Sequence, residues 1–199
     1  MLNKIIELDK DLMIFLNKSI SNFLFDFIMP VITSKDFLTV IGFLLIFYLA
    51  VFCGKKGKIA ILVLIFAAGS SDAICAQIIK PWAGRIRPSH EFNEFINLLV
   101  SKGGKWSFPS NHAANSFAFA TVLSYFFEQK KLALFTLASI IAFSRVYVGV
   151  HYPLDIIFGA MIGYILSWMV LSIWVIVKMR ELKRGKMWVW YANDSPPLS

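Results

Sequence analysis

The sequence is short of charged residues and of cysteine. Only 16% of its 199 residues are Asp, Glu, Lys or Arg, whereas a soluble domain carries about 25%. The two cysteines, Cys53 and Cys75, both lie inside apolar stretches and suggest neither a disulfide framework nor a metal-ligand spacing. These shortages argue against a soluble enzyme, a disulfide-stapled secreted domain and a cysteine-ligated metal site.

Hydrophobic residues are abundant instead. They make up 58% of the chain, and the mean hydropathy is +0.67. One domain, 1–199, has room for roughly five or six membrane-crossing helices of about 20 residues each. The net charge of +8 does not indicate nucleic-acid binding, because most Lys and Arg residues lie in short clusters between the apolar runs or inside motifs. The expected partners are an anionic substrate and the membrane lipids, and no obligate protein partner is evident.

Five apolar runs have the length needed to cross the hydrocarbon layer of a membrane. They cover residues 36–54, 59–79, 113–127, 132–150 and 154–177. Within 1–20, apolar residues recur at helical spacing opposite charged ones, which is typical of an interfacial helix or of the start of a first span. We interpret 12–33 as a first, weak spanning helix. The predicted fold is therefore an all-α integral membrane bundle of six transmembrane helices.

The basic residues predict the orientation of this bundle. Ten of them lie on one side by parity, which the positive-inside rule makes cytoplasmic: Lys55, Lys56, Lys58, Lys130, Lys131, Lys178, Arg180, Lys183, Arg184 and Lys186. The basic and aromatic tail, 178–199, belongs to this side. The loop 81–109 belongs to the outer side, and its segment 91–101 predicts a short amphipathic helix. This helix either covers a path for lipids or simply packs on the bundle.

Three motifs at the ends of the spans carry the chemistry, and all three fall on the outer side. The first places Lys80 at the end of one span and Arg87 beyond a turn, where Pro88 disfavours helix for Arg87. Two cations on one turn are suited to a phosphate group. Snorkelling of both side chains to the membrane interface is the alternative explanation.

The second motif, Pro109-Ser110-Asn111-His112, opens a span. Ser110 is well placed as the N-cap of this helix. The free backbone N–H groups at the helix end, with its positive dipole, form a site for an anion that His112 would also face. The alternative is a capped helix with an incidental histidine.

The third motif joins Ser144-Arg145 to His151 and Asp155. Pro153 is typical of a first helical turn, so Asp155 could reach back to His151. It would accept the Nδ1 proton and leave Nε2 free as a nucleophile. A guanidinium near a membrane boundary, such as that of Arg145, is expected to be paired or to bind an anion.

Together these motifs resemble the signature of the type 2 phosphatidic acid phosphatase family: Lys-x6-Arg-Pro, Pro-Ser-Gly-His and Ser-Arg-x5-His-x3-Asp. The matching stretches run from Lys80 to Pro88, from Pro109 to His112 and from Ser144 to Asp155. Soluble vanadium-dependent haloperoxidases share this signature, but the hydrophobic spans disfavour that branch. The resemblance implies a six-helix membrane enzyme that needs no metal and no cofactor.

The resemblance also implies a role for each residue. His151 would form a phosphohistidine, Asp155 would orient it, and His112 would protonate the leaving group. The phosphoryl oxygens would be bound by Lys80, Arg87, Ser110, Asn111 and Arg145. Asn111 stands where the family has glycine, so the local backbone geometry is expected to differ. Its amide could add a donor, and we expect an altered fit rather than lost activity.

The predicted function is hydrolysis of a lipid phosphate monoester or pyrophosphate at the periplasmic face of a bacterial inner membrane. The family implies four candidate substrates: undecaprenyl diphosphate, phosphatidylglycerol phosphate, phosphatidic acid and the 1-phosphate of lipid A. Two alternatives stay open. One is a lipid phosphotransferase that uses the same phosphohistidine. The other is a non-catalytic, anion-binding transporter, which would need the cations but be indifferent to His151 and Asp155.

Three polar residues outside the motifs complete the list of candidates. Asp72 lies in the middle of a span, where we expect a buried hydrogen bond to a neighbouring helix or to Ser70 or Ser71 rather than chemistry. His90 is expected to be an ordinary loop residue. Arg85 lies between the cations of the first motif. It either contacts lipid head groups or has no such contact, and the sequence favours neither.

Overall fold

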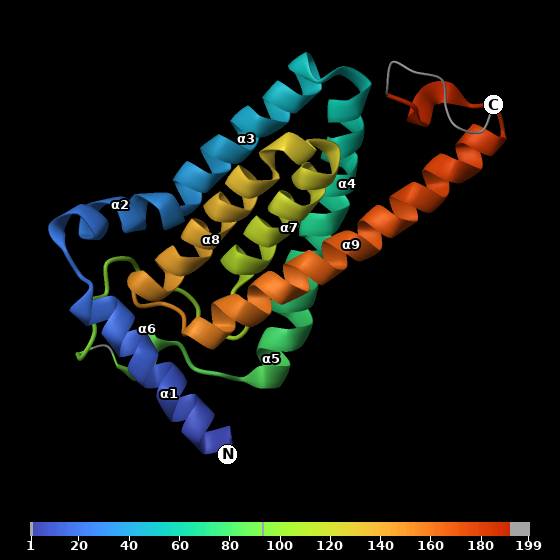
Figure 1. Cartoon of the computed structure of the whole chain (residues 1–199). Coiled ribbons are helices and arrows are strands. Elements are labelled where there is room, and N and C mark those ends of the chain that lie inside the picture. The colour runs from blue at the N-terminus through green and yellow to red at the C-terminus, as the bar shows by residue number, and fades with distance from the viewer. Residues whose placement is uncertain (1, 93, 192–199) are drawn as a thin grey trace.

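The computed structural model describes residues 2–92 and 94–191, and within these ranges the chain is helical and contains no strand. Figure 1 shows the helices as one bundle with a shorter helix across one end. The helices are α1 (Leu2–Ile14), α2 (Phe23–Thr33), α3 (Lys35–Phe52), α4 (Gly54–Ala73), α5 (Lys80–Ala83), α6 (Pro88–Glu91), α7 (Asn111–Phe126), α8 (Lys131–Tyr147) and α9 (Pro153–Lys183). Wider π-helical turns cover Phe15–Ser19 and Ile74–Ile79, and short 3-10 turns cover Glu128–Lys130 and Met187–Val189.

Each of the five strong predicted spans corresponds to a long helix. Within the described ranges, three helical stretches are long and apolar enough to cross a membrane: Lys35–Phe52, Gly54–Ala83 and Pro153–Lys183. Helices α7 and α8 have 16 and 17 residues, slightly fewer than the ~20 of a full span. The all-α membrane fold is therefore confirmed, whereas length alone does not identify six crossings.

The prediction of one continuous helix over 12–33 is wrong. The chain bends by 117° between Asn3–Ser19 and Phe23–Thr33, so α1 crosses the end of the bundle, whereas α2 lies beside α8 and leads into α3 (Figure 1). The polar residues at the bend make this break favourable. Asn22 caps α2 by accepting a hydrogen bond from the backbone N–H of Phe25 at 3.0 Å, and Ser21 Oγ donates to the Asp26 carboxylate at 3.1 Å.

Helix α1 turns an apolar face outward and a partly polar face toward the bundle. Ile5, Leu8 and Leu12 are exposed, whereas Asp9 and Met13 are buried. Charged residues such as Glu7 and Asp11 are exposed as well, and a helix that exposes both apolar and charged residues suits the surface of a bilayer. The geometry is consistent with the interfacial helix expected for 1–20.

Helix α7 is the centre of the bundle, between α4, α8 and α9 (Figure 1). Glycines bring α9 close to it: a Cβ atom at Gly163 would lie 2.0 Å from the carbonyl oxygen of Ala114, and one at Gly159 would lie 2.5 Å from that of Ser110. Small residues at a helix interface allow such close backbone contact in membrane proteins. This contact brings the N-terminal ends of α7 and α9 together.

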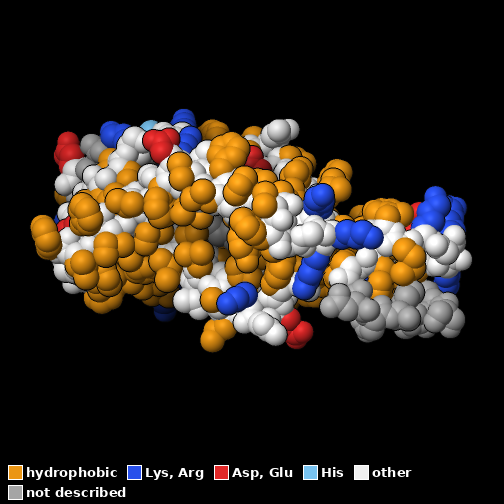
Figure 2. Space-filling view, turned by 90° about the horizontal axis from the view of Figure 1, so that it is seen from above, with side chains coloured by type: hydrophobic (Ala, Val, Ile, Leu, Met, Phe, Trp, Pro, Cys, Tyr) orange, Lys and Arg blue, Asp and Glu red, His pale blue; other side chains and the backbone are white. Residues whose placement is uncertain are grey.

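The outer surface of the bundle is strongly apolar. Figure 2 shows hydrophobic side chains over most of one face, with Lys and Arg side chains mainly near its edges and toward the C-terminal end. Along α3, for example, Val40, Phe43, Leu44, Phe47 and Val51 are all exposed. An apolar surface of this extent indicates contact with lipid rather than with water.

The loop beyond α5 differs from the prediction. Helix α6 has only four residues, and the described part of 92–101 is irregular, so the amphipathic helix predicted over 91–101 is wrong. Asn17 explains how this segment is held, because its side chain accepts from the N–H of Asn97 at 2.7 Å and donates to the carbonyl of Asn97 at 2.9 Å. Ile96 is buried among Met13, Val146 and other apolar residues. The segment packs on the bundle, which was one of the two expected outcomes.

The C-terminal helix is longer than predicted, because α9 continues to Lys183 rather than ending near 177. The segment after it folds back, and the ammonium group of Lys178 lies over the rings of Trp190 and Tyr191 at 4.8 and 4.6 Å. Cation–π contacts of this kind attach the described part of the basic and aromatic tail to the helix. Residues 192–199 of the predicted tail lie outside the described residues.

Candidate active site

The predicted site residues gather at one end of the bundle, where α5, α6, the start of α7, the end of α8 and the start of α9 meet (Figure 1). Lys80 approaches from the end of the α4–α5 stretch. Its ammonium group donates to the carbonyl oxygens of Ser107 at 3.2 Å and Pro109 at 2.6 Å. Lys80 is therefore held directly beside the second motif.

Arg87 enters from the loop with the extended backbone that Pro88 predicts, at φ −73° and ψ 149°. Its Nε donates to the carbonyl of Trp106 at 3.0 Å. Gly103 (φ +68°) leaves space for the guanidinium group, since a Cβ atom there would lie 2.5 Å from Nη1 of Arg87. Burial lowers the pKa of Arg87, and the nearby Asp155 carboxylate opposes this effect.

Ser110 caps α7 as predicted, with Oγ accepting from the N–H of Ala113 at 3.5 Å. The side-chain amide of Asn111, predicted to bind phosphate, has a partner on α4. Its amide donates to Asp72 Oδ1 at 2.7 Å, and the amide of Asn115 donates to the same oxygen at 3.2 Å. The side-chain donor of Asn111 is thus used between α7 and α4.

The same contacts correct the expectation for Asp72. Its hydrogen bonds do join two helices, but the partners lie on α7, whereas Ser70 Oγ donates to the carbonyl of Ala67 within its own helix. Asp72 is also exposed rather than buried. The interhelical role was predicted correctly, and the partner serines and the burial were not.

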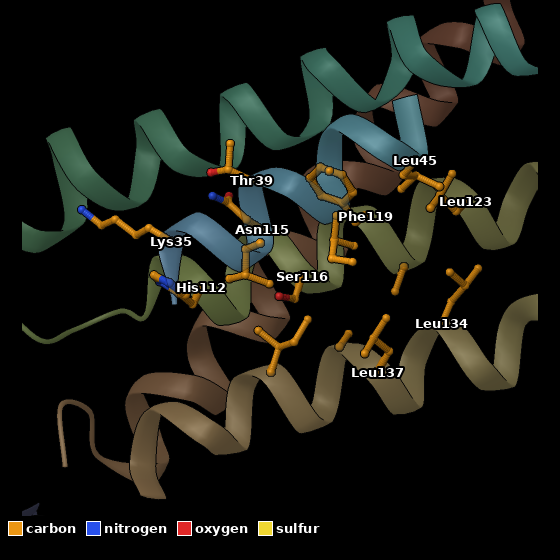
Figure 3. A pocket seen from close by; sticks show the side chains of 16 residues that line it. Lys35, Thr39, Leu45, His112, Asn115, Ser116, Phe119, Leu123, Leu134 and Leu137 are labelled. Atoms are coloured by element: carbon orange, nitrogen blue, oxygen red, sulfur yellow. The ribbon is translucent and has the colours of Figure 1, made fainter. Parts of the chain in front are cut away.

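His112 lies at the polar end of a cavity of about 400 Å³ between α3, α7 and α8. Figure 3 shows Lys35, Thr39, His112 and Asn115 together at this end, and Leu45, Leu123 and Leu134 toward the other. A cavity that is polar at one end and apolar along its length matches the shape of a lipid with a charged head. Lys35 belongs to none of the three motifs, but it lines the same cavity as His112.

Arg145 is almost completely buried, with 8% of its surface exposed. Its Nη1 donates to Thr33 Oγ1 at 2.6 Å, but its buried Nε has no hydrogen-bond partner. Within residues 2–92 and 94–191, no carboxylate pairs with Lys80, Arg87 or Arg145. A buried N–H without a partner and three cations without an ion pair among these residues are the features expected of a site for an anion.

His151 and Asp155 form the pair that their spacing predicts. Nδ1 of His151 lies 3.3 Å from Oδ2 of Asp155, and the same oxygen accepts from the N–H of Tyr152 at 2.9 Å. Pro153 occupies the first turn of α9. Burial is the main cause that lowers the pKa of His151; Arg87 and Arg145 add to it, and Asp155 opposes it. A neutral imidazole with Nδ1 toward a carboxylate has Nε2 available for attack.

Asp9 was missed from the sequence, and the partners of Arg85 were not predicted. Arg85 Nη1 pairs with Asp155 Oδ1 at 3.0 Å and Nη2 pairs with Asp9 Oδ2 at 2.6 Å, so Arg85 binds carboxylates rather than lipid head groups. Asp9 is 76 residues away from Arg85 in the chain, and no motif connects the two. His90 lies in the short helix α6 and is exposed, with Nε2 3.3 Å from the carbonyl of Gly103.

The fold and the site define a class: a helical membrane protein with a cluster of cationic side chains beside a His–Asp pair. In the described part of the chain, no group of three or more His, Cys, Asp or Glu residues could hold a metal ion. Residues 58–178 match the family model of the PAP2 superfamily, and the chain belongs to this superfamily. The predicted family is thereby confirmed.

Curated relatives extend the match over most of the chain. A lipid A 4'-phosphatase of Bacteroides thetaiotaomicron is 31% identical over 82% of this chain and 75% of that relative. A lipid A 4'-phosphatase of Porphyromonas gingivalis is 29% identical over 89% of this chain and 78% of that relative. These relatives are named as phosphatases, and the assignment of this chain to the phosphatase class of enzymes is confirmed.

Two crystal structures have the same fold. Aquifex aeolicus LpxE, 30% identical, superposes with a TM-score of 0.63 over 83% of this chain and 95% of that one. A transmembrane PAP2-type phosphatidylglycerolphosphate phosphatase from Bacillus subtilis, 24% identical, superposes with a TM-score of 0.65 over 86% of each chain. The second likeness concerns the fold alone.

Proposed function

We propose that this protein hydrolyses a phosphate ester of a membrane lipid through a phosphohistidine on His151. The observation that carries the proposal is the cluster of Lys80, Arg87 and Arg145, which have no paired carboxylate among the described residues and which adjoin a buried His–Asp pair. Three fixed cations can neutralise the charge of a phosphoryl group as it is transferred.

The reaction has two steps. In the first, the Nε2 lone pair of His151 attacks phosphorus, the P–O bond to the lipid breaks, and the leaving oxygen takes a proton from His112. In the second, water attacks phosphorus, the P–N bond breaks, and His112 takes the proton from the water. Asp155 orients His151 through Nδ1. The phosphoryl oxygens are held by the three cations and by the capped N-terminus of α7 at Ser110.

The cavity beside His112 supports a lipid substrate, because its apolar length lies between α3, α7 and α8. We place lipid A phosphates first, since two relatives that match most of this chain are named lipid A 4'-phosphatases. Phosphatidylglycerol phosphate, phosphatidic acid and undecaprenyl diphosphate are the comparison substrates. We place the active site on the periplasmic face of a bacterial inner membrane, opposite the cluster of basic residues.

Phosphate release from purified lipids tests this function. The detergent-solubilised protein is incubated with lipid A, phosphatidylglycerol phosphate, phosphatidic acid and undecaprenyl diphosphate, and inorganic phosphate is measured. We expect release from lipid A above the others, no release by His151→Ala, and unchanged release by His90→Ala, a matched histidine outside the site. Failure on all four lipids, or equal activity of His151→Ala, would refute the proposal.

A further inference from the structure

Both carboxylate oxygens of Asp155 are occupied, and they face different neighbours. Oδ2 is directed toward His151 Nδ1 at 3.3 Å and accepts from the N–H of Tyr152 at 2.9 Å. Oδ1 accepts from Arg85 Nη1 at 3.0 Å. The carboxylate that orients His151 is therefore shared with a cation on the other side, and it is completely buried.

Arg85 is itself balanced by a second acid on a distant helix. Its Nη2 donates to Asp9 Oδ2 at 2.6 Å, and Asp9 Oδ1 accepts from the N–H of Leu154 at 2.9 Å. Asp9 is only 4% exposed. One carboxylate of α1 thus contacts both Arg85 and the first turn of α9, the turn that carries Asp155.

Tyr152 completes the support of Arg85. The guanidinium carbon lies 3.8 Å from the centre of the Tyr152 ring, and the Tyr152 hydroxyl donates to Glu91 Oε2 at 2.7 Å. Glu91 also pairs with Lys10, the neighbour of Asp9 on α1. Stacking and two ion pairs fix the guanidinium plane, which a lysine could not reproduce.

We propose that Arg85 and Asp9 are positioning residues, which act through Asp155 to fix the orientation and the proton affinity of His151. The proposal rests on the proposed function for its effect on turnover. It makes α1 a structural part of the active site and assigns a role to Arg85 that the three motifs do not include.

The charges that surround His151 determine the direction of the effect. Three charged groups act directly on the pKa of His151. They are Asp155 in the first turn of α9, Arg87 in the loop before α6 and Arg145 at the end of α8. Arg85 and Asp9 stand behind Asp155. Loss of the Arg85 charge leaves the Asp155 charge less compensated, so the pKa of His151 should rise. Loss of the Asp9 charge strengthens the pull of Arg85 on Asp155, so that pKa should fall.

The opposite signs give the experiment. The chain has three histidines, so ¹³C-labelled imidazoles of the protein in detergent can be titrated by NMR, with His151 assigned from a His151→Asn variant. We expect Arg85→Gln to raise the pKa of His151 by about one unit. Asp9→Asn alone should lower it, and adding Asp9→Asn to Arg85→Gln should change it little further, because Asp9 acts through Arg85. The exposed residues Asp11 and Lys102 provide matched charge-removal controls, Asp11→Asn and Lys102→Gln, which should leave it unchanged.

Turnover supplies the second readout. With the lipid phosphate that the wild type cleaves fastest, Arg85→Gln should lower kcat about 10- to 100-fold and move the acid limb of kcat/KM upward, with little change in KM. Arg85→Lys should restore the position of the acid limb and only part of kcat. Because the titration needs no turnover, an inactive wild type would refute the proposed function while the NMR result still decides this inference. Shifts of the same sign in Arg85→Gln and Asp9→Asn, or no shift in either, would overturn it.

Discussion

Ser110, at the start of α7, donates its backbone N–H to the backbone carbonyl of Asp155, in the first turn of α9, at 3.0 Å. This single bond joins the second motif to the third. It is possible because Gly159 and Gly163 allow α9 to approach α7 closely. The proposed phosphate-binding helix end and the proposed nucleophile are thus positioned by the same helix contact.

Gly163 should be sensitive even to the smallest substitution. A Cβ atom there would lie 2.0 Å from the backbone carbonyl of Ala114, and backbone cannot move aside cheaply. We expect Gly163→Ala to destabilise the protein by about 1–3 kcal/mol and to lower activity, as measured by thermal unfolding and phosphate release in detergent. Gly69→Ala is the matched control, since a Cβ atom there meets nothing within 4 Å. Equal unfolding temperatures for the two variants would contradict the close contact.

The two histidines should respond differently to the leaving group. His151→Ala removes the attacking nitrogen, so no phosphoenzyme and no turnover should remain on any substrate. His112→Ala leaves the nucleophile but removes the proton donor. It should lose about 100- to 10,000-fold on a lipid phosphate monoester and much less on nitrophenyl phosphate, whose leaving group needs no proton. Rates of phosphate release from both substrates test this, and an equal loss on both would contradict the role given to His112.

Asn111 should contribute to stability more than to chemistry. Its amide donates to Asp72 at 2.7 Å, and its replacement by glycine restores the family motif. We expect Asn111→Gly to keep kcat within about threefold and to cost about 1 kcal/mol of stability, measured by activity and thermal unfolding. Asp72→Asn should show the same pattern, because it weakens the same contact. A loss of kcat as large as that of His112→Ala would place Asn111 among the reacting groups.

The orientation can be tested with single cysteines. Ser101 lies in the loop between α6 and α7 and Gln129 in the turn before α8, and both are exposed. In a background with Cys53 and Cys75 replaced by serine, an impermeant thiol reagent should label Ser101→Cys in intact cells but not Gln129→Cys. Permeabilised cells, in which both should react, serve as the control. Labelling of Gln129→Cys alone in intact cells would place the active site in the cytoplasm.

Local sequence was sufficient for much of this protein. Apolar runs of span length predicted the five long helices, since hydrophobicity along a helix depends on the residues of that helix alone. Ser110 as an N-cap, Arg87 on extended backbone before Pro88 and Asp155 one turn after His151 also follow from neighbours within a few residues. The family motifs then predicted which end of the bundle holds the site.

Contacts between distant segments could not be read in this way. The bend after Ser19, the donor of Asn111 turned toward Asp72, and the packed segment over Ile96 each depend on a partner that no periodicity identifies. The clearest case is Arg85, whose two partners lie 76 and 70 residues away. A charged residue in a sequence has many possible partners. Only the packing of α1 against the start of α9 brings Asp9 and Asp155 to Arg85. The same packing strengthens both ion pairs, because it excludes water from the two carboxylates.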